Sequence, residues 1–264
     1  MNLPTKFTKT FIENLKKYQP ILRKMKENEV NETDTVKVIN DILSDLLGYD
    51  KYSDITSEYA IRGTYCDLAI KGSNNKPYIL IEVKGISIAL NDNHIKQAID
   101  YGANEGVNWC VLTNGEYWKV YRIKFAQPID KELVLEFNLL DLNVKDEKML
   151  SMIFALSKLG KEKSVIEDLY SEIQVKNKYI IGALLNSGDV FSLIKKNMRK
   201  LFDDIKISEE EISSFVRNDI IRRDIIDTDE AKKAVKDIEK RRKKLENKIK
   251  KDQEKNSEID KKEV

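Results

Sequence analysis

Apolar residues follow a helical spacing near the start of the chain. Residues 7–28 show this spacing, but Pro20 interrupts it, which predicts one broken helix or two short ones. The next stretch, "ETDTVKVINDILSDLLGYD", predicts one long helix that ends at Gly48. Its apolar stripe consists of Val36, Ile39, Ile42, Leu43, Leu46 and Leu47.

The middle of the chain alternates apolar and polar residues with a period of two. Residues 55–61, "CDLAI" (66–70) and "PYILIEV" (77–83) predict three consecutive strands, and "GSNNKP" predicts the last turn between them. A helix from residue 92 to about residue 104 is expected next, followed by strands over "VNWCVLT" and "YWKVYRI". A strand, a helix and a strand in this order imply a parallel crossover. "LVLEFNLLDL" (133–142) predicts a further strand.

Strand signals stop near residue 145, and helical stripes follow. Ser208-x-x-Glu211 predicts a capping box, with Ile207 and Ile212 placed as a hydrophobic staple. We therefore expect an α/β domain over residues 1–145, a helical region over 146–228 and a basic amphipathic tail over 229–264. The thin apolar stripe of the tail comprises Ala231, Val235, Ile238, Leu245 and Ile249, with Arg242 completing the heptad register.

Composition and charge limit the classes of protein to which this chain can belong. The 264 residues suffice for one large domain or two modest ones, and the net charge is only +2. Residues 232–251 nevertheless hold eleven Lys or Arg against three acidic residues, so any basic surface is local. Cys66 and Cys110 lie in apolar runs, which predicts reduced thiols and a cytoplasmic protein. No run of eighteen apolar residues and no signal-peptide pattern is visible, so we expect neither export nor membrane insertion.

Three charged residues stand in apolar strands. Glu82 and Lys84 share one face of their predicted strand because strand side chains alternate, and Asp67 on the preceding strand can lie beside Glu82. Carboxylates that lie so close together repel one another unless a cation lies between them. Mg²⁺ is commonly bound by carboxylates, a carbonyl oxygen and water. The alternative is a plain ion pair of Lys84 with Asp67 or Glu82 at the edge of a sheet.

These residues also occur in a recognisable order. Asp67, then Glu82-Val83-Lys84, then Gln97-x-x-x-Tyr101 resembles the PD-(D/E)XK nuclease superfamily, in the branch that includes the N-terminal nuclease domain of type I restriction endonuclease motor subunits. "NETDTVKVINDILSDLLGYD", with Glu32, and "WCVLTNGEYWKVYRI" match the same branch, so the resemblance covers about residues 28–125. Architecture and length are most similar to stand-alone predicted type IV restriction endonucleases. The proline of the family's name is absent before Asp67.

The resemblance implies a restriction-endonuclease-like mixed sheet with flanking helices and a set of site residues. Asp67, Glu82 and the Val83 carbonyl would bind Mg²⁺, with Mn²⁺ as a substitute, and Lys84 would position the attacking water. Further roles fall to residues outside these strands: Gln97 and Tyr101 would orient the DNA strand or the lysine, Glu32 would reach the metal shell directly or through water, and alternation could aim Glu58 toward the site.

The predicted function is metal-dependent hydrolysis of DNA phosphodiester bonds in restriction or defence against foreign DNA. The alternative is a non-catalytic nucleic-acid-binding or scaffold protein on a nuclease fold. No G-x-x-x-x-G-K followed by Ser or Thr occurs, so a DNA motor, if the reaction needs one, would be a separate partner. A separate specificity partner is a further expectation. The heptad register of the tail allows a homodimer, and its cations could either follow a phosphate backbone or only solvate a helix.

Other candidates have simpler interpretations. His94 is the single histidine and lies near Gln97, but "NDNH" is typical of a helix start rather than of a general base. Trp109, Trp118 and Tyr121 could stack on bases, although their strands favour core and rim positions.

Overall fold

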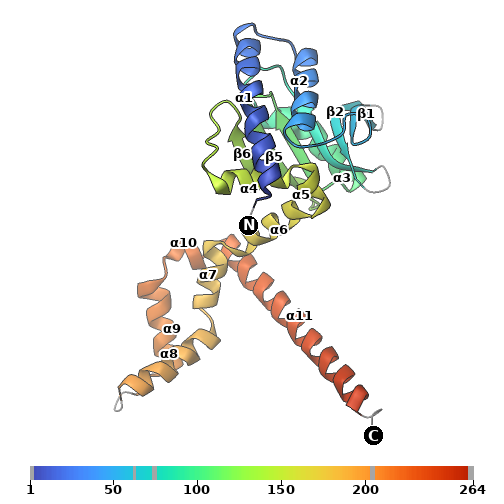
Figure 1. The fold of residues 1–264 in the computed structure, drawn as a ribbon. Coiled ribbons are helices and arrows are strands. Elements are labelled where there is room, and N and C mark those ends of the chain that lie inside the picture. Colours follow the sequence, from blue (N-terminus) through green and yellow to red (C-terminus); the bar gives the residue numbers. More distant parts are fainter. Residues whose placement is uncertain (1–2, 62–63, 73–75, 203–205, 261–264) are drawn as a thin grey trace. The chain divides into compact units, whose positions relative to one another are not determined.

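A six-stranded mixed sheet organises the first part of the chain (Figure 1). In the computed structural model, which describes residues 3–61, 64–72, 76–202 and 206–260, the strands lie in sequence order. All neighbours are antiparallel except β3 and β4, which are parallel and joined through α3 (Asp92–Glu105). The predicted meander, crossover and α/β fold class are thereby confirmed. The strands are β1 (Ile55–Ile61), β2 (Thr64–Lys71), β3 (Pro77–Val83), β4 (Trp109–Thr113), β5 (Tyr117–Lys124) and β6 (Asp130–Asn138).

Helices cover both faces of this sheet (Figure 1). On one face α1 (Thr5–Glu27), α2 (Glu32–Asp45) and α4 (Glu147–Ala155) contribute to the larger apolar cluster. The short helix α5 (Lys158–Glu162) follows α4. On the other face α3 packs Ile95, Ala98 and Ile99 against Leu80 and Leu112. The predicted helix before Gly48 is confirmed, and Gly48 adopts the left-handed φ of +78° that suits a glycine after a helix.

The expected break at Pro20 is wrong, because α1 is one continuous helix with Pro20 inside it. A proline inside a helix removes one hydrogen bond and costs about 3 kcal/mol. The buried stripe of α1, which includes Leu15 and Leu22, continues on both sides of the proline. Gln19 and Arg23 also donate hydrogen bonds to backbone carbonyls at residues 139 and 140. Packing and these bonds hold both halves in line.

The compact unit that contains the sheet extends to Tyr170, and a second unit comprises Ser171–Val264. The strands end at Asn138, so the helices from α4 onward begin within the first unit. α6 (Val165–Val175) crosses the division, and its first residues, Val165 and Ile166, belong to the apolar cluster of the sheet.

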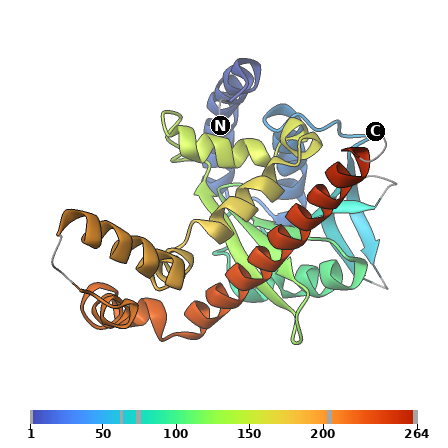
Figure 2. The ribbon, with the colours of Figure 1, turned by 90° about the horizontal axis from the view of Figure 1, so that it is seen from below.

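The second unit is entirely helical among the residues that the structure describes. Ser208 and Glu211 form the predicted capping box, and Ile207 packs with Ile212 in a small apolar cluster. The last helix is uninterrupted (Figure 2), and it buries Ala231 and Ala234 near its start. The elements are α7 (Lys178–Leu185), α8 (Gly188–Leu201), α9 (Glu209–Phe215), the π-helical turn η2 (Val216–Ile220), α10 (Arg223–Ile226) and α11 (Asp229–Asp260).

Two predictions about the whole chain can be compared with the structure. Cys66 and Cys110 are free and buried, as the sequence predicts. Within the described part of the chain, no helix is long and apolar enough to cross a membrane.

The contact between α1 and α2 makes a pH-dependent contribution to stability. Asp45 accepts hydrogen bonds from Lys17 (2.8 Å) and Tyr18 (2.7 Å), which hold the pKa of this carboxyl below its ordinary value. A carboxyl with a lowered folded-state pKa stabilises the protein above its unfolded-state pKa of about 3.9 and loses this effect as the pH falls through the folded value. The ionised form of Asp45 therefore stabilises the fold at neutral pH.

We expect Asp45→Asn to lower the free energy of unfolding at pH 7, because the ionised partner of Lys17 and Tyr18 is lost. The decrease should be only about 1 kcal/mol, since solvent screens this partly exposed pair. The difference from the wild type should shrink as the pH falls below about 4. Urea denaturation at several pH values measures it. A difference that stays constant between pH 7 and pH 3 would contradict the assignment.

Candidate active site

The register between β2 and β3 places Asp67 beside Glu82. Leu68 pairs with Ile81 at the end of the antiparallel pairing. Asp67, which precedes Leu68, therefore lies opposite Glu82, which follows Ile81. The Asp67 carboxylate reaches further along β3 and accepts a hydrogen bond from the Val83 backbone N–H, at 2.7 Å from Oδ2. The two carboxylates and the Val83 backbone therefore occupy one end of the β2–β3 pair.

Lys84 joins this group from the end of β3. Its Nζ lies 2.9 Å from Oε1 of Glu82, which confirms that the two side chains share a face. Both are largely buried, with 19% of the Lys84 side chain and 16% of the Glu82 side chain exposed. The ammonium also lies 3.5 Å from the Glu32 carboxylate, which α2 presents from its first residue. Three elements, α2, β2 and β3, thus meet at this group.

Burial dominates the electrostatics of the two carboxylates. It raises the pKa of Glu82, and the neighbouring charge of Asp67 raises it further against the opposing effect of Lys84. The pKa of Asp67 is also raised by burial and by the charges of Glu32 and Glu58, against the Val83 N–H and Lys84. For Lys84, burial alone would lower the pKa, but Glu82, Glu32 and Asp67 outweigh it, so the pKa is raised. The group therefore carries more negative charge than its one lysine balances.

The donor atoms suit a hard divalent cation. Asp67 and Glu82 supply carboxylate oxygens, which together with the nearby Val83 carbonyl are donors that Mg²⁺ favours. Burial raises the pKa of both carboxyls, and the nearby charge of Asp67 raises that of Glu82 further, so a cation bound between them would offset this repulsion. Among the described residues, no group of three or more His, Cys, Asp or Glu side chains is arranged to hold a metal. The predicted set has only two such side chains and would need water to complete its coordination.

Three further predicted residues lie on α3 and β1. Gln97 and Tyr101 lie one turn apart on α3 and are hydrogen-bonded to each other, at 2.9 Å between Nε2 and Oη. α3 covers the face of the sheet that carries Leu80, and Glu82, two residues further along β3, shares that face. Glu58 on β1 has a left-handed φ of +48°, and its charge acts on Asp67 across the strand pair. This supports the expectation that Glu58 faces the site.

Other sequence candidates have structural roles. His94 completes a capping box with Asn91 at the start of α3, as expected for a helix start. Trp109 is fully buried and donates a hydrogen bond to Glu167, while Trp118 stacks on Phe137. Tyr121 is only 4% exposed. The interpretation of these three aromatic residues as core and rim residues is confirmed.

Sequence reasoning missed the importance of the turn between β4 and β5. "TNG" lies within the stretch "WCVLTNGEYWKVYRI" that matches the family, and its Thr113 and Asn114 are buried. Thr113 O accepts a hydrogen bond from the Lys84 N–H at 2.9 Å. Glu116 is also buried and forms an ion pair with Lys26 at 2.6 Å. The available signal was a four-residue stretch between two apolar strands that holds a threonine, an asparagine and a glutamate.

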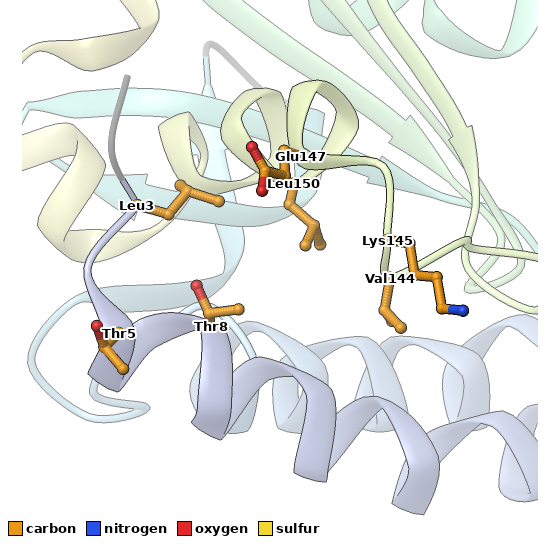
Figure 3. A pocket seen from close by; sticks show the side chains of 7 residues that line it. All are labelled: Leu3, Thr5, Thr8, Val144, Lys145, Glu147 and Leu150. Atoms are coloured by element: carbon orange, nitrogen blue, oxygen red, sulfur yellow. The ribbon is translucent and has the colours of Figure 1, made fainter.

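Two cavities can be compared with this site. One of about 580 Å³ lies between the start of α1 and the segment that leads into α4, and Figure 3 shows Leu3, Thr8 and Leu150 among its lining residues. No predicted site residue lines it, so its location gives no support for a role in catalysis. The other, of about 370 Å³, is lined by residues 86–90 of the β3–α3 loop, which follows Lys84, and by Asn114.

The comparisons with known proteins agree with the geometry. Residues 32–134 match the family described as type I restriction enzyme R protein N terminus (HSDR_N). This segment contains the meander, the crossover and every predicted site residue, so the resemblance to the N-terminal domain of type I restriction enzyme R subunits is confirmed over it. The match indicates a restriction-related nuclease domain. No curated protein and no solved structure shows a significant match to the chain.

The raised pKa of Asp67 has a consequence for stability. A carboxyl with a raised folded-state pKa destabilises the fold above its unfolded-state pKa, because its ionisation is less favourable in the folded protein. With EDTA present at pH 7, we expect Asp67→Asn to raise the Tm by about 3 °C, which corresponds to about 1 kcal/mol for a unit of this size.

Differential scanning calorimetry measures this change, and Asp45→Asn is the matched control because its expected shift has the opposite sign. A Tm that falls in Asp67→Asn as much as in Asp45→Asn would contradict the electrostatic interpretation of the site.

Proposed function

We propose that the protein is a Mg²⁺-dependent endonuclease that hydrolyses DNA phosphodiester bonds, in cytoplasmic restriction or defence against foreign DNA. The observation that carries the proposal is the meeting of Asp67, Glu82 and Lys84 at one end of the β2–β3 pair. The family match over residues 32–134 supports it, because the matched family is a domain of restriction enzymes.

The two carboxylates are the proposed metal ligands. Asp67 and Glu82 would hold Mg²⁺ or Mn²⁺ with the Val83 carbonyl, and the bound ion would polarise the scissile phosphate and lower the pKa of a coordinated water. The hydrogen bond from Val83 N–H to Asp67 fixes one carboxylate oxygen and leaves the other available. The ion pair with Lys84 similarly engages one oxygen of Glu82. Each side chain is oriented by one oxygen and can bind through the other.

Lys84 is the proposed catalytic cation. The acidic residues around it raise its pKa, so it is protonated at neutral pH and can donate hydrogen bonds. In the reaction it would hold the attacking water and offset the negative charge that develops on the phosphate. Its partial burial strengthens both effects, because fewer water molecules screen the ammonium.

Glu32, Gln97 and Tyr101 are proposed to position these groups. Glu32 lies within 3.5 Å of the Lys84 ammonium and would orient it or reach the metal through water. Gln97 and Tyr101 present a hydrogen-bonded amide and hydroxyl on α3, which would orient the DNA strand or the lysine. Glu58 would add negative charge beside Asp67.

DNA contacts outside the site are proposed for α11. Its residues 241–249 are exposed and include Arg241, Lys243, Lys244 and Lys248, a set of side chains that can neutralise phosphates. The exposed Val235, Leu245 and Ile249 lie in the heptad register and would allow a homodimer, which suits cleavage of both strands of a duplex. Translocation, if the reaction requires it, would come from a separate motor partner.

The cleavage activity is directly testable. Purified full-length protein with Mg²⁺ or Mn²⁺ is expected to nick or cleave duplex DNA, tested on modified and unmodified plasmids by gel electrophoresis. Asp67→Ala and Lys84→Ala should each lower the rate at least about a hundredfold, because each removes an interaction that acts on the transition state.

Lys124→Ala is the control, since Lys124 pairs with Glu132 on the neighbouring strand and has no proposed role in the site. Cleavage that survives both Asp67→Ala and Lys84→Ala would refute the assignment of the site.

Divalent-metal binding separates the enzyme from a scaffold protein on a nuclease fold. Isothermal titration of the wild type with Mn²⁺ should show a site that Glu82→Ala removes, because one of two carboxylate ligands is lost. Glu132→Ala, which removes a carboxylate near the end of the sheet, should leave the titration unchanged. Absence of binding in the wild type would favour the scaffold interpretation.

A further inference from the structure

The segment between β3 and α3 begins with Lys84 and has no regular secondary structure. Lys84 to Leu90 form turns and irregular backbone, and residues 87–89 are exposed. Ile86 is buried in the larger apolar cluster and Leu90 packs against the smaller one, and hydrogen bonds further determine how well ordered the backbone of the segment is. The position of the Lys84 side chain depends on this order, because Lys84 is the first residue after the strand ends.

Asn114 binds this segment through both of its amide hydrogens. Its Nδ2 donates to the carbonyl oxygens of Ile86, at 3.1 Å, and Ile88, at 3.0 Å. The parallel register pairs Val83 with Thr113, so Asn114 follows β4 where Lys84 follows β3. The Lys84 backbone N–H also donates to Thr113 O at 2.9 Å. The two neighbouring residues Thr113 and Asn114 thus hold the segment at positions 84, 86 and 88.

The amide oxygen of Asn114 has a separate structural role. Its Oδ1 accepts from the N–H groups of Glu116, at 3.2 Å, and Tyr117, at 2.8 Å, which closes the turn between β4 and β5. An aspartate could do the same, since Asn and Asp both form such turns. Only the amide can in addition donate to two carbonyl oxygens. The turn itself needs only the acceptor, so the two hydrogen bonds from Nδ2 require asparagine rather than aspartate at this position.

The same segment lies against the helix that carries Glu32. A side chain at Gly85 would bring its Cβ to 3.6 Å from the Glu32 backbone nitrogen and 3.7 Å from Val30 O. Ser87 further donates to Lys26 O, near the end of α1. The segment is thus held between the β4–β5 turn on one side and the start of α2 on the other. Fixing it at Ile86 and Ile88 constrains both Lys84 and its neighbour Glu32.

We infer that Asn114 is a positioning residue, which holds the segment after β3 through Ile86 O and Ile88 O so that Lys84 is kept beside Glu82. Asn114 is 2% exposed, and its four hydrogen bonds use both donors and both acceptor positions of the amide. The catalytic meaning of this contact rests on the proposed nuclease function, whereas the contact itself is independent of it.

Asn114→Asp separates the two tasks of the side chain. The carboxylate keeps the acceptors for Glu116 and Tyr117, but it cannot donate and would face two carbonyl oxygens. Asn114→Ala removes both tasks. The control is Asn177→Asp, because Asn177 likewise accepts two backbone N–H groups and donates to a carbonyl, that of Gln174, in the second unit.

Three measurements on the full chain decide the inference. Hydrogen exchange read by mass spectrometry should show amides 84–90 exchanging about tenfold faster or more in Asn114→Asp than in the wild type. Acetylation with acetic anhydride should label Lys84 faster than in the wild type. With Mg²⁺ and saturating duplex DNA, the single-turnover cleavage rate should fall about tenfold or more, while the Kd for DNA changes less than about twofold.

The outcomes distinguish the inference from the function on which it rests. Wild-type exchange and wild-type Lys84 labelling in Asn114→Asp would overturn the inference, as would faster exchange with an unchanged cleavage rate. If the wild type cleaves no DNA, the proposed function fails, and exchange and labelling alone decide whether Asn114 holds Lys84. A response of the same size in Asn177→Asp would show a general effect of the substitution and would also overturn it.

Discussion

Two carboxylates lie side by side in a largely buried part of this protein, and each must be compensated by its neighbours. The register of β2 and β3 places Asp67 beside Glu82, and burial raises the pKa of both carboxyls. Lys84 and the Val83 N–H compensate only part of this cost, because Glu32 and Glu58 add further negative charge nearby. An arrangement that costs stability without a clear structural benefit is typical of a functional site, where a ligand supplies the missing interaction.

The mixed sheet supplies the rigidity that such an arrangement needs. Two strands of the meander carry the carboxylates, and the parallel neighbour β4 ends beside Lys84. The turn after β4 then links several elements: Asn114 binds the segment after β3, while Glu116 binds Lys26 on α1 and accepts from Asn138 on β6. Catalytic side chains at strand ends require support of this kind, since a displacement of about 1 Å can cost two orders of magnitude in rate.

Much of this architecture could be predicted from the sequence, because its signals are local. Alternation in residues 55–83 gave the meander, and the Gly48 stop and the Ser208 capping box gave helix limits. Glu82 and Lys84 were predictable as neighbours because residues two positions apart along extended backbone share a face, and Lys84 directly follows β3. The continuity of α1 through Pro20 was not predictable, because it depends on contacts of Gln19 and Arg23 with residues 139 and 140, more than a hundred positions away. The partners of Asn114 were hidden for the same reason: they are backbone carbonyls of another segment.

We propose that Asp67, Glu82 and the Val83 carbonyl bind one divalent ion beside Lys84. Anomalous diffraction from crystals of the protein soaked in Mn²⁺ would locate such an ion. The claim predicts a strong anomalous peak within coordination distance of an Asp67 oxygen, a Glu82 oxygen and the Val83 carbonyl oxygen, which is about 2.0–2.4 Å for a cation of this kind. A peak that lies elsewhere, or no peak at saturating Mn²⁺ with these side chains ordered, would contradict it.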